Sequence, residues 1–311
     1  MGKKTSAPEA ATPTGPTSNA AEPTQCFPTW PALLRLVRGS IRNVRTKSDD
    51  RMLARRLFSG ATSASGPKGR RAYVIGDVHG RLDLLNRLLE RIEADIARGR
   101  TLKTSIVFVG DLVDRGPDSA GVIERLRTYS PASASVHFIM GNHEEVMLRV
   151  LAGETELLPS WLRFGGVQTL ESYGVDPSAL AGLEPAEIVD RLSRAVPESH
   201  QDFIAGFSDS ISFGGYLFVH AGIRPGIALA EQSQSDLRWI RDPFLEDSTN
   251  HGFVVVHGHT ITSEVEVTPN RIGIDTGAFY SGILTALAIE GRNRWLLQTT
   301  DTGTERLSLD R

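Results

Sequence analysis

The sequence predicts an α/β fold, and three observations support this prediction. Between residues 70 and about 150, a short apolar strand, a polar loop and a helix follow one another three times, which is typical of a mainly parallel sheet. After residue 210, apolar segments separated by polar turns predict further strands. The 311 residues, 40% hydrophobic and 23% charged, have the composition of an ordinary globular protein with a sizeable core.

The first 69 residues differ from the rest of the chain. Residues 1–28 are rich in Ala, Pro and Thr and contain few large apolar side chains, so we expect a disordered tail. Residues 29–69 predict a basic amphipathic arm followed by a flexible linker, because apolar and basic side chains alternate over residues 29–58. The arm could contact an anionic membrane surface or a partner protein, or it could be a solvated helix that packs loosely on the main domain.

Composition also limits the possible functions. The net charge of −3 gives no reason to expect a nucleic-acid partner. The single cysteine, Cys26, excludes an intrachain disulfide and fits a reducing compartment. No apolar run approaches the roughly 20 residues that span a bilayer, and the N-terminus lacks the apolar core of a secretory signal. We therefore expect a cytoplasmic protein.

Residues 70–311 are expected to form one domain. The first three strands, each followed by a helix, are expected at residues 72–76, 105–109 and 135–139. Residues 150–207 have helical periodicity interrupted by Pro and Gly, which predicts a helical insertion beside the sheet edge. Later strands are expected at residues 211–213, 216–219, 253–256, 264–267, 271–274, 284–289 and 295–297, the last four as an antiparallel run.

Polar side chains follow five of these strands directly. The carboxyl ends of parallel strands meet at one edge of a sheet, where ligands bind. In an extended segment, side chains two residues apart point the same way, so Asp77 and His79 can reach one ion. The six strand-end residues are Asp77, His79, Asp111, Asn142, His220 and His259.

This set of side chains predicts a metal site. Mixed carboxylate, amide and imidazole ligands suit borderline divalent ions such as Mn²⁺, Fe or Zn²⁺ rather than Ca²⁺. We expect Mn²⁺, with Fe, Zn²⁺ or Ni²⁺ as alternatives. Six ligands are too many for one catalytic ion that keeps an open position. They fit two ions that share a bridging carboxylate.

Five segments resemble, in the right order, the motifs of the calcineurin-like metallophosphoesterases. They are Gly76–Gly80, Gly110–Gly116, Gly141–Glu144, His220–Gly222 and Gly258–Thr260. The Asp-Arg-Gly and Asn-His-Glu forms, with Ile261 where other branches carry a second His, resemble the phosphoprotein phosphatase branch. That branch includes bacterial symmetrical diadenosine tetraphosphate hydrolases. The resemblance spans about residues 70–290 and implies a sandwich of two mixed β-sheets flanked by helices.

The resemblance also implies roles for the metal ligands. Asp77 and His79 would hold the first ion, and Asp111 would bridge the two ions. Asn142, His220 and His259 would hold the second. Two divalent ions in such a site generate the hydroxide that attacks phosphorus.

Other motif residues are implied to bind phosphate and move a proton. His143 would be the general acid, and Asp114 would orient it and keep it protonated. Arg115 and Arg241 would bind the phosphate together with Asn142.

Several of these residues could instead have purely structural roles. Asp114 and Arg115 could instead form a salt bridge at the start of a helix, and Arg241 could be a surface arginine near Asp242. Arg224 is a weaker candidate for phosphate binding. We expect His257, which lies outside the motif, to support the site without binding metal.

The resemblance leaves the substrate open. We expect a serine/threonine protein phosphatase, with a hydrolase of dinucleoside polyphosphates or other small phosphate esters as the alternative. Met140 stands where protein phosphatases of this branch usually carry Arg, and Arg163 in the helical insertion could replace that cation. A different class of function, a non-catalytic phosphate-binding scaffold, would require a protein that is free of metal and inactive.

Overall fold

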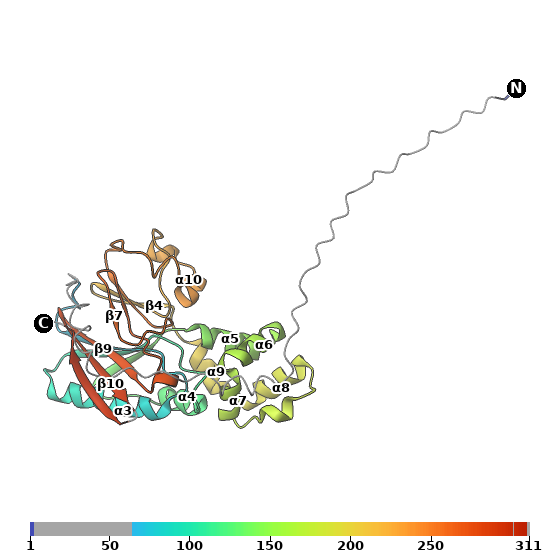
Figure 1. The fold of residues 1–311 in the computed structure, drawn as a ribbon, viewed down its shortest axis with the longest axis horizontal. Helices are drawn as coiled ribbons and strands as arrows, with labels where there is room; N and C mark the ends of the chain where they lie inside the picture. The colour runs from blue at the N-terminus through green and yellow to red at the C-terminus, as the bar shows by residue number, and fades with distance from the viewer. Residues whose placement is uncertain (3–63, 301, 310–311) are drawn as a thin grey trace. The chain divides into compact units, whose positions relative to one another are not determined.

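The computed structural model describes residues 1–2, 64–300 and 302–309 (Figure 1). The chain divides into two units, Met1–Arg45 and Thr46–Arg311, and the fold described below belongs to the second. The predictions for the tail of residues 1–28 and for most of the arm and linker of residues 29–69 lie outside the described residues. Among the described residues, no helix is both long and apolar enough to cross a membrane.

Two mixed sheets form the centre of this unit, which confirms the predicted α/β sandwich. The first sheet has the order β11-β10-β9-β1-β2-β3. Its strands are β1 (Arg70–Ile75), β2 (Lys103–Phe108), β3 (Ala134–Phe138), β9 (Leu284–Glu290), β10 (Asn293–Thr300) and β11 (Gly303–Ser308). The first three are parallel, and β9 pairs antiparallel with β1.

The second sheet has the order β4-β5-β6-β8-β7. Its strands are β4 (Ser210–Phe213), β5 (Tyr216–Val219), β6 (Val254–His257), β7 (Glu266–Val267) and β8 (Arg271–Gly273). The prediction of an antiparallel run through the last strands is wrong for β8, which pairs parallel with β6. The chain from residue 258 to 270 crosses back to the start of β6, so β8 enters the sheet in the same direction.

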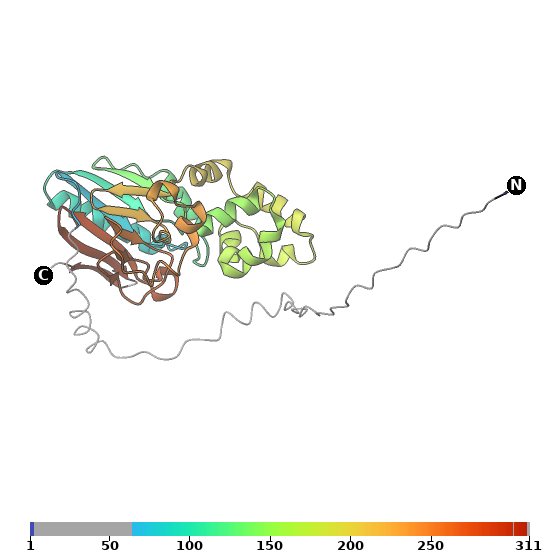
Figure 2. The ribbon, with the colours of Figure 1, turned by 90° about the horizontal axis from the view of Figure 1, so that it is seen from above.

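A series of helices lies between β1 and β4 along the chain, and the first of them packs against the first sheet. They are α3 (Leu82–Arg98), α4 (Ser119–Arg127), α5 (Asn142–Leu151), α6 (Leu158–Trp161), α7 (Val167–Ser172), α8 (Pro185–Ala195) and α9 (Glu198–Ala205). The short α10 (Gln234–Trp239) and α11 (Ala278–Ser281) follow β5 and β8. Figures 1 and 2 show α5 to α9 gathered on one side of the sheets. They include the residues for which the sequence predicts a helical insertion.

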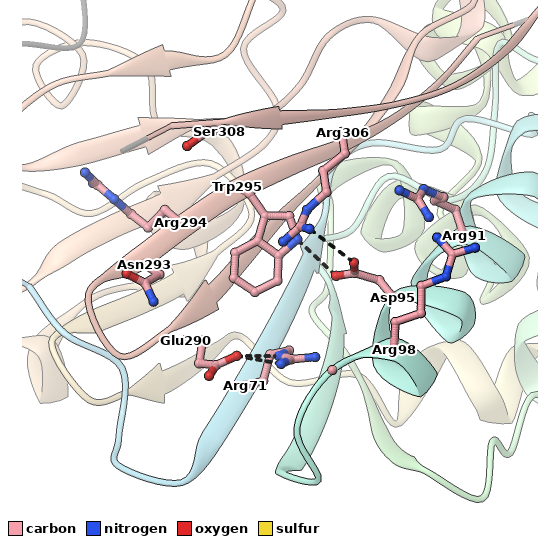
Figure 3. Close-up of a pocket in the computed structure, with 11 residues that line it drawn as sticks. Arg71, Arg91, Asp95, Arg98, Glu290, Asn293, Arg294, Trp295, Arg306 and Ser308 are labelled. Carbon is pink, nitrogen blue, oxygen red and sulfur yellow. Dashed lines mark hydrogen bonds and ion pairs between the residues drawn. The ribbon is translucent and has the colours of Figure 1, made fainter. Parts of the chain in front are cut away.

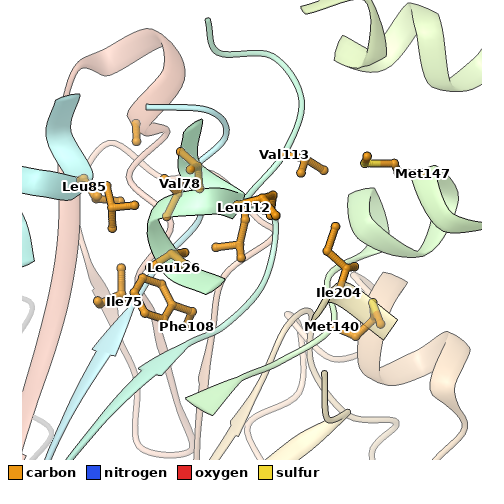
Figure 4. Packing of buried hydrophobic residues seen from close by; sticks show 14 of the residues in the cluster. Ile75, Val78, Leu85, Phe108, Leu112, Val113, Leu126, Met140, Met147 and Ile204 are labelled. Carbon is orange, nitrogen blue, oxygen red and sulfur yellow. The ribbon is translucent and has the colours of Figure 1, made fainter. Parts of the chain in front are cut away.

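Strand β1 separates two hydrophobic cores. Tyr73 and Ile75 point to the core under the helices, whereas Ala72 and Val74 point to the core between the sheets. Successive side chains of a strand point to opposite faces, so a strand buried on both faces is a continuous apolar run. Figure 4 shows the helix-side core, where β-strand residues and the loop after β2 pack together. This packing holds the ends of the parallel strands in fixed positions.

Candidate active site

Loops after five parallel strands meet at one edge of the two sheets. Asp77 and His79 follow β1, and Asp111 follows β2. Asn142 opens α5 just after β3, whereas His220 and His259 follow β5 and β6 of the other sheet. All six side chains are buried. The structure therefore brings together every residue for which the sequence predicts metal binding.

The backbone at this edge is strained. The described residues include five non-glycine residues in the left-handed region, and all five belong to these loops. They are His79 (φ 44°), Asp111 (φ 50°), Asp114 (φ 72°), Arg115 (φ 67°) and His259 (φ 62°). Such conformations cost of order 1–3 kcal/mol each and persist where the surrounding structure imposes them, often at functional sites.

Two glycines allow the loops to approach so closely. A Cβ at Gly116 would collide with the carbonyl oxygen of His79, and a Cβ at Gly258 would collide with Oδ1 of Asp77. Both glycines lie in the motifs that the sequence analysis identified. Only glycine at these two positions lets the loops pack this closely against His79 and Asp77.

Asp111 lies between two groups of possible metal ligands. His79, Asp111 and His143 form one group, and Asp111, His220 and His259 form the other. One oxygen of Asp111, Oδ2, lies 3.6 Å from His79 Nε2, and the other, Oδ1, lies 3.3 Å from His220 Nε2. A carboxylate with one oxygen toward each group has the geometry of a bridging ligand.

Hydrogen bonds fix the ring nitrogens that face the centre. His79 Nδ1 donates to Val113 O at 2.7 Å, and His220 Nδ1 donates to Val109 O at 2.8 Å. Each Nε2 atom therefore presents a lone pair to Asp111. Burial lowers the pKa of both imidazoles, which keeps them in the neutral form that binds metal.

Two electron-pair donors face each other in this structure without a proton between them, because His220 Nε2 lies 2.9 Å from Asn142 Oδ1 while His220 Nδ1 carries the ring proton. His259 Nδ1 donates to the same oxygen at 2.8 Å, since its Nε2 accepts from Arg241. Burial alone would raise the pKa of Asp111, but the surrounding imidazoles outweigh it and hold that pKa below its usual value. A buried carboxylate, an amide oxygen and imidazole lone pairs that converge in this way fit a divalent cation.

Asp77 lies near Asp275 and Asp111 and belongs to neither ligand group. Its carboxylate accepts a hydrogen bond from the backbone of His259 at 3.0 Å. Burial raises its pKa, and the nearby carboxylates of Asp275 and Asp111 raise it further. Burial also raises the pKa of Asp275 to about 6. A bound cation would lower the pKa of both carboxyl groups again, so Asp77 and Asp275 suit a site that holds positive charge.

Asp275 is a residue that the sequence analysis missed. It follows β8 at the same sheet edge, and its Oδ1 accepts the backbone N–H of Gly277 at 2.9 Å. An acidic residue just after an apolar strand was the signal that identified the other ligands. The same signal was present at residue 275.

His143 and Asp114 form a hydrogen-bonded pair. His143 Nδ1 lies 2.6 Å from Asp114 Oδ2, and both side chains are buried. Burial lowers the pKa of His143, but Asp111 and Asp114 outweigh it, and the net shift is upward. The arrangement turns Nε2 toward the centre, where this nitrogen could donate a proton or bind metal. The role of general acid remains a prediction, because His143 also belongs to the first ligand group.

The helical region holds Asp114 in place. Thr169 Oγ1 donates to Asp114 Oδ1 at 2.6 Å, and Trp161 Nε1 donates to Asp114 Oδ2 at 3.0 Å. The backbone N–H of Asp114 donates to Ser119 Oγ at 2.9 Å. Sequence analysis could not identify Trp161 and Thr169, because these contacts join residues 47 and 55 positions apart.

Glu144 is a further functional residue that the sequence analysis did not assign. It is fully buried, and its carboxylate accepts the backbone N–H groups of Asp111, Leu112 and Val113 at 2.7–3.2 Å. It also accepts the N–H of Gly141, the residue just before α5, at 3.1 Å, and so pairs one backbone donor at the start of the helix. Glu144 therefore fixes the loop that carries Asp111. Its place directly after His143 in the motif was the available signal.

The predicted phosphate-binding arginines differ in their surroundings. Arg115 donates to His79 Nε2 and His143 Nε2, each at 2.9 Å, and its guanidinium lies 5.0 Å from the ring of Phe279. Arg241 Nε lies 3.4 Å from His259 Nε2, at the other end of the centre. The structure therefore places one guanidinium beside each ligand group.

Four other positions from the sequence analysis belong to neither ligand group. Arg224 pairs with Asp236 at 2.6 Å, and Arg163 stacks on the neighbouring ring of Phe164. Met140 is buried in the hydrophobic core. His257 is also buried, at the end of β6, where burial lowers its pKa to about 4, and it belongs to neither ligand group.

The chain is similar in sequence to known proteins. The profile of the calcineurin-like phosphoesterase family matches residues 70–277. A symmetrical bis(5'-nucleosyl)-tetraphosphatase of Dechloromonas aromatica is 30% identical, over 77% of this chain and 99% of its own length. The asymmetrical bis(5'-nucleosyl)-tetraphosphatase PrpE of Halalkalibacterium halodurans is 26% identical, over 69% of this chain and 88% of its own.

Solved structures confirm the fold. A proposed diadenosine tetraphosphatase superposes with a TM-score of 0.52 at 19% identity, over 77% of this chain and 96% of its own. A cold-active protein tyrosine phosphatase superposes with a TM-score of 0.51 at 18% identity, over 77% of this chain and 80% of its own. With two buried His/Asp groups at the sheet edge, the chain belongs to the calcineurin-like phosphoesterase family and is a metal-dependent phosphoesterase of its phosphoprotein phosphatase-like branch.

Proposed function

We propose that this protein hydrolyses dinucleoside polyphosphates, with bis(5'-nucleosyl) tetraphosphates as substrates. The observation that carries the proposal is the match to a symmetrical bis(5'-nucleosyl)-tetraphosphatase over 99% of that relative's length. The relatives favour this substrate over the phosphoproteins that the motifs suggested first. We keep the expected Mn²⁺ cofactor and cytoplasmic location as parts of the proposal.

The surroundings of the site support this choice. Met140 is buried in the hydrophobic core, and its thioether cannot act as the cation that protein phosphatases usually carry there. Arg115 and Arg241 lie beside opposite ligand groups, where they could bind different phosphates of one chain. Trp239, two residues before Arg241, is 41% exposed. Tyr280, next to Phe279, is 61% exposed. Exposed rings near a phosphate site suit a substrate that carries bases.

Each residue would have a defined part in the reaction. Two divalent ions held by the strand-end residues would supply hydroxide at neutral pH and neutralise phosphate charge. Arg115 and Arg241 would hold phosphate oxygens and stabilise the charge that grows on them in the transition state. His143, oriented by Asp114, would protonate the leaving oxygen as its bond to phosphorus breaks.

A substrate comparison tests the proposal. The full chain, supplied with Mn²⁺, is assayed on diadenosine tetraphosphate and on a phosphoserine peptide, and kcat/KM is compared. We expect a clear preference for the dinucleotide. Chromatography of the products shows which bond breaks, since symmetrical cleavage gives two ADP and asymmetrical cleavage gives ATP and AMP. A preference for the phosphopeptide would contradict the proposal.

A further inference from the structure

A cavity of about 610 Å³ lies at the other end of β1 from the metal centre (Figure 3). Arg71, near the start of β1, lines it, whereas the predicted ligand Asp77 follows the end of the strand. The remaining walls come from α3, β9, β10 and β11. The cavity therefore shares a strand with the active site but none of the active-site residues.

The lining of this cavity is strongly basic. Five arginines, Arg71, Arg91, Arg98, Arg294 and Arg306, face two carboxylates, Asp95 and Glu290. Among the residues that line the cavity, arginines therefore outnumber carboxylates by three. Like charges held this close repel one another, and a bound anion would relieve the repulsion.

The two carboxylates are already engaged by other groups. Glu290 pairs with Arg71 at 2.5 Å and with Arg100 at 2.8 Å. Asp95 accepts hydrogen bonds from Tyr73 Oη at 2.8 Å and from Trp295 Nε1 at 3.1 Å.

Arg91 and Arg98 therefore keep their donors available. They lie seven positions apart on α3, so they share one face of the helix, as Figure 3 shows. Within residues 64–300 and 302–309, neither side chain has a hydrogen bond or an ion pair. Two free guanidinium groups that face a cavity can donate hydrogen bonds to a bound anion.

Stacking holds two other arginines in position. The guanidinium of Arg71 lies 5.6 Å from the ring of Trp295, and that of Arg306 lies 4.9 Å from the same ring. Trp295 itself is buried and anchored by its hydrogen bond to Asp95. Such contacts reduce the entropy that these side chains would lose on binding a ligand.

We infer that this cavity is a binding site for a small, multiply charged phosphate compound, distinct from the catalytic centre. Arginine forks match phosphate oxygens, and the volume lies within the range of small-molecule sites. The shared chemistry is an oligophosphate group, which could belong to an inorganic oligophosphate or to a nucleotide.

Equilibrium dialysis of the metal-loaded full chain tests this inference. The probe is methylenediphosphonate, whose P–C–P bond the enzyme cannot hydrolyse. We expect two classes of binding site in the wild type, at the metal centre and in the cavity. The charge reversal Arg91→Glu with Arg98→Glu is expected to weaken one class at least about tenfold, because each lost charge-assisted hydrogen bond is worth that much.

A matched variant separates this effect from a general change in charge. Arg191→Glu with Arg194→Glu makes the same change of charge on α8, away from the cavity. It is expected to keep both classes. If the first double variant does not fold, Arg91→Gln with Arg98→Gln removes the charges without reversing them. A single class in the wild type, or two unchanged classes in the cavity variants, would overturn the inference.

Competition identifies the source of the phosphate group. The first competitor is α,β-methylene ADP, which the enzyme cannot hydrolyse between its two phosphorus atoms. If it displaces the probe from the cavity at a lower concentration than unlabelled methylenediphosphonate does, the ligand is a nucleotide. Equal or weaker displacement indicates an inorganic oligophosphate. Displacement by an oligoglutamate peptide at lower concentration than by either compound would overturn the inference in favour of an acidic protein segment.

Discussion

Single residues in this site carry more than one possible role, and His143 is the main example. Its Nδ1 is held by Asp114, and its Nε2 lies 3.9 Å from Asp111 Oδ2. The same nitrogen can therefore donate a proton to a leaving group or bind the first ion. These roles predict different outcomes when the imidazole is removed.

We expect His143→Ala to lose activity while keeping both metal ions. General acid catalysis contributes about 10²–10⁴-fold, and an alkyl phosphate needs the proton more than an aryl phosphate, whose leaving group is a weaker base. The variant should therefore lose more of its kcat on the alkyl ester. Metal content is measured on the same preparation, and loss of an ion from it would make His143 a ligand.

Tyr280 is a single residue through which recognition of the base of the proposed dinucleotide substrate can be tested. Its ring lies 5.3 Å from Phe279, whose ring in turn lies 5.5 Å from His79. If the proposed substrate is correct, Tyr280 can stack on a base. A stacked base is worth about 1–3 kcal/mol, so Tyr280→Ala should raise KM for diadenosine tetraphosphate about fivefold to a hundredfold.

Two controls accompany the Tyr280 variant. Tyr280→Phe keeps the ring and should bind normally, and the inhibition constant of inorganic tetraphosphate, which has no base, should not change. An unchanged KM in Tyr280→Ala would remove the stacking role while leaving the proposed function intact. A wild type without activity on the dinucleotide would contradict the proposed function itself.

At the scale of elements, the short helix α7 supports the catalytic loop from outside the motifs. Thr169 on α7 is 1% exposed and bonds both the side chain and the backbone of Asp114. We expect Thr169→Val to destabilise the fold by about 1–3 kcal/mol, because a buried polar group loses its partner. We also expect a fall in kcat of about tenfold, with both metals retained, since a misplaced acid costs rate.

Ser172→Ala provides the matched control on the same helix. Ser172 Oγ accepts from the backbone of Ala120 at 3.1 Å and donates to the backbone oxygen of Thr169 at 2.7 Å, and it has no hydrogen bond to Asp114 among the described residues. Thermal unfolding and kcat are measured for both variants. Equal loss of kcat in the two would mean that α7 acts through general stability and not through Asp114.

The elements also show what sequence patterns can and cannot predict. The ends of parallel strands were predictable, because apolar runs followed by Asp, Asn or His recur after β1, β2, β3, β5 and β6. The direction of β8 was not predictable from its own short sequence, since it depends on the path of residues 258–270. The contacts of Trp161 and Thr169 with Asp114 depend on how separate helices pack, and no local period encodes that packing.

At the scale of the whole molecule, stability and metal binding are coupled. Acidic side chains and imidazoles from both sheets are buried at one edge, together with strained backbone at five positions. A cation that binds only the folded protein stabilises it by about 2.7 kcal/mol per site at a concentration of 100 times Kd. For a domain of this size, that corresponds to about 5–10 °C in Tm per occupied site.

We therefore expect a chelator to abolish activity and lower Tm, and added Mn²⁺ to restore both. The ligands must lose protons to bind metal, so the Mn²⁺ concentration that restores half the activity should rise as the pH falls. His259→Ala serves as the comparison, because it removes a ligand from the second group only and should keep about one ion per chain. Full activity and an unchanged Tm after complete removal of metal would contradict the two-metal site.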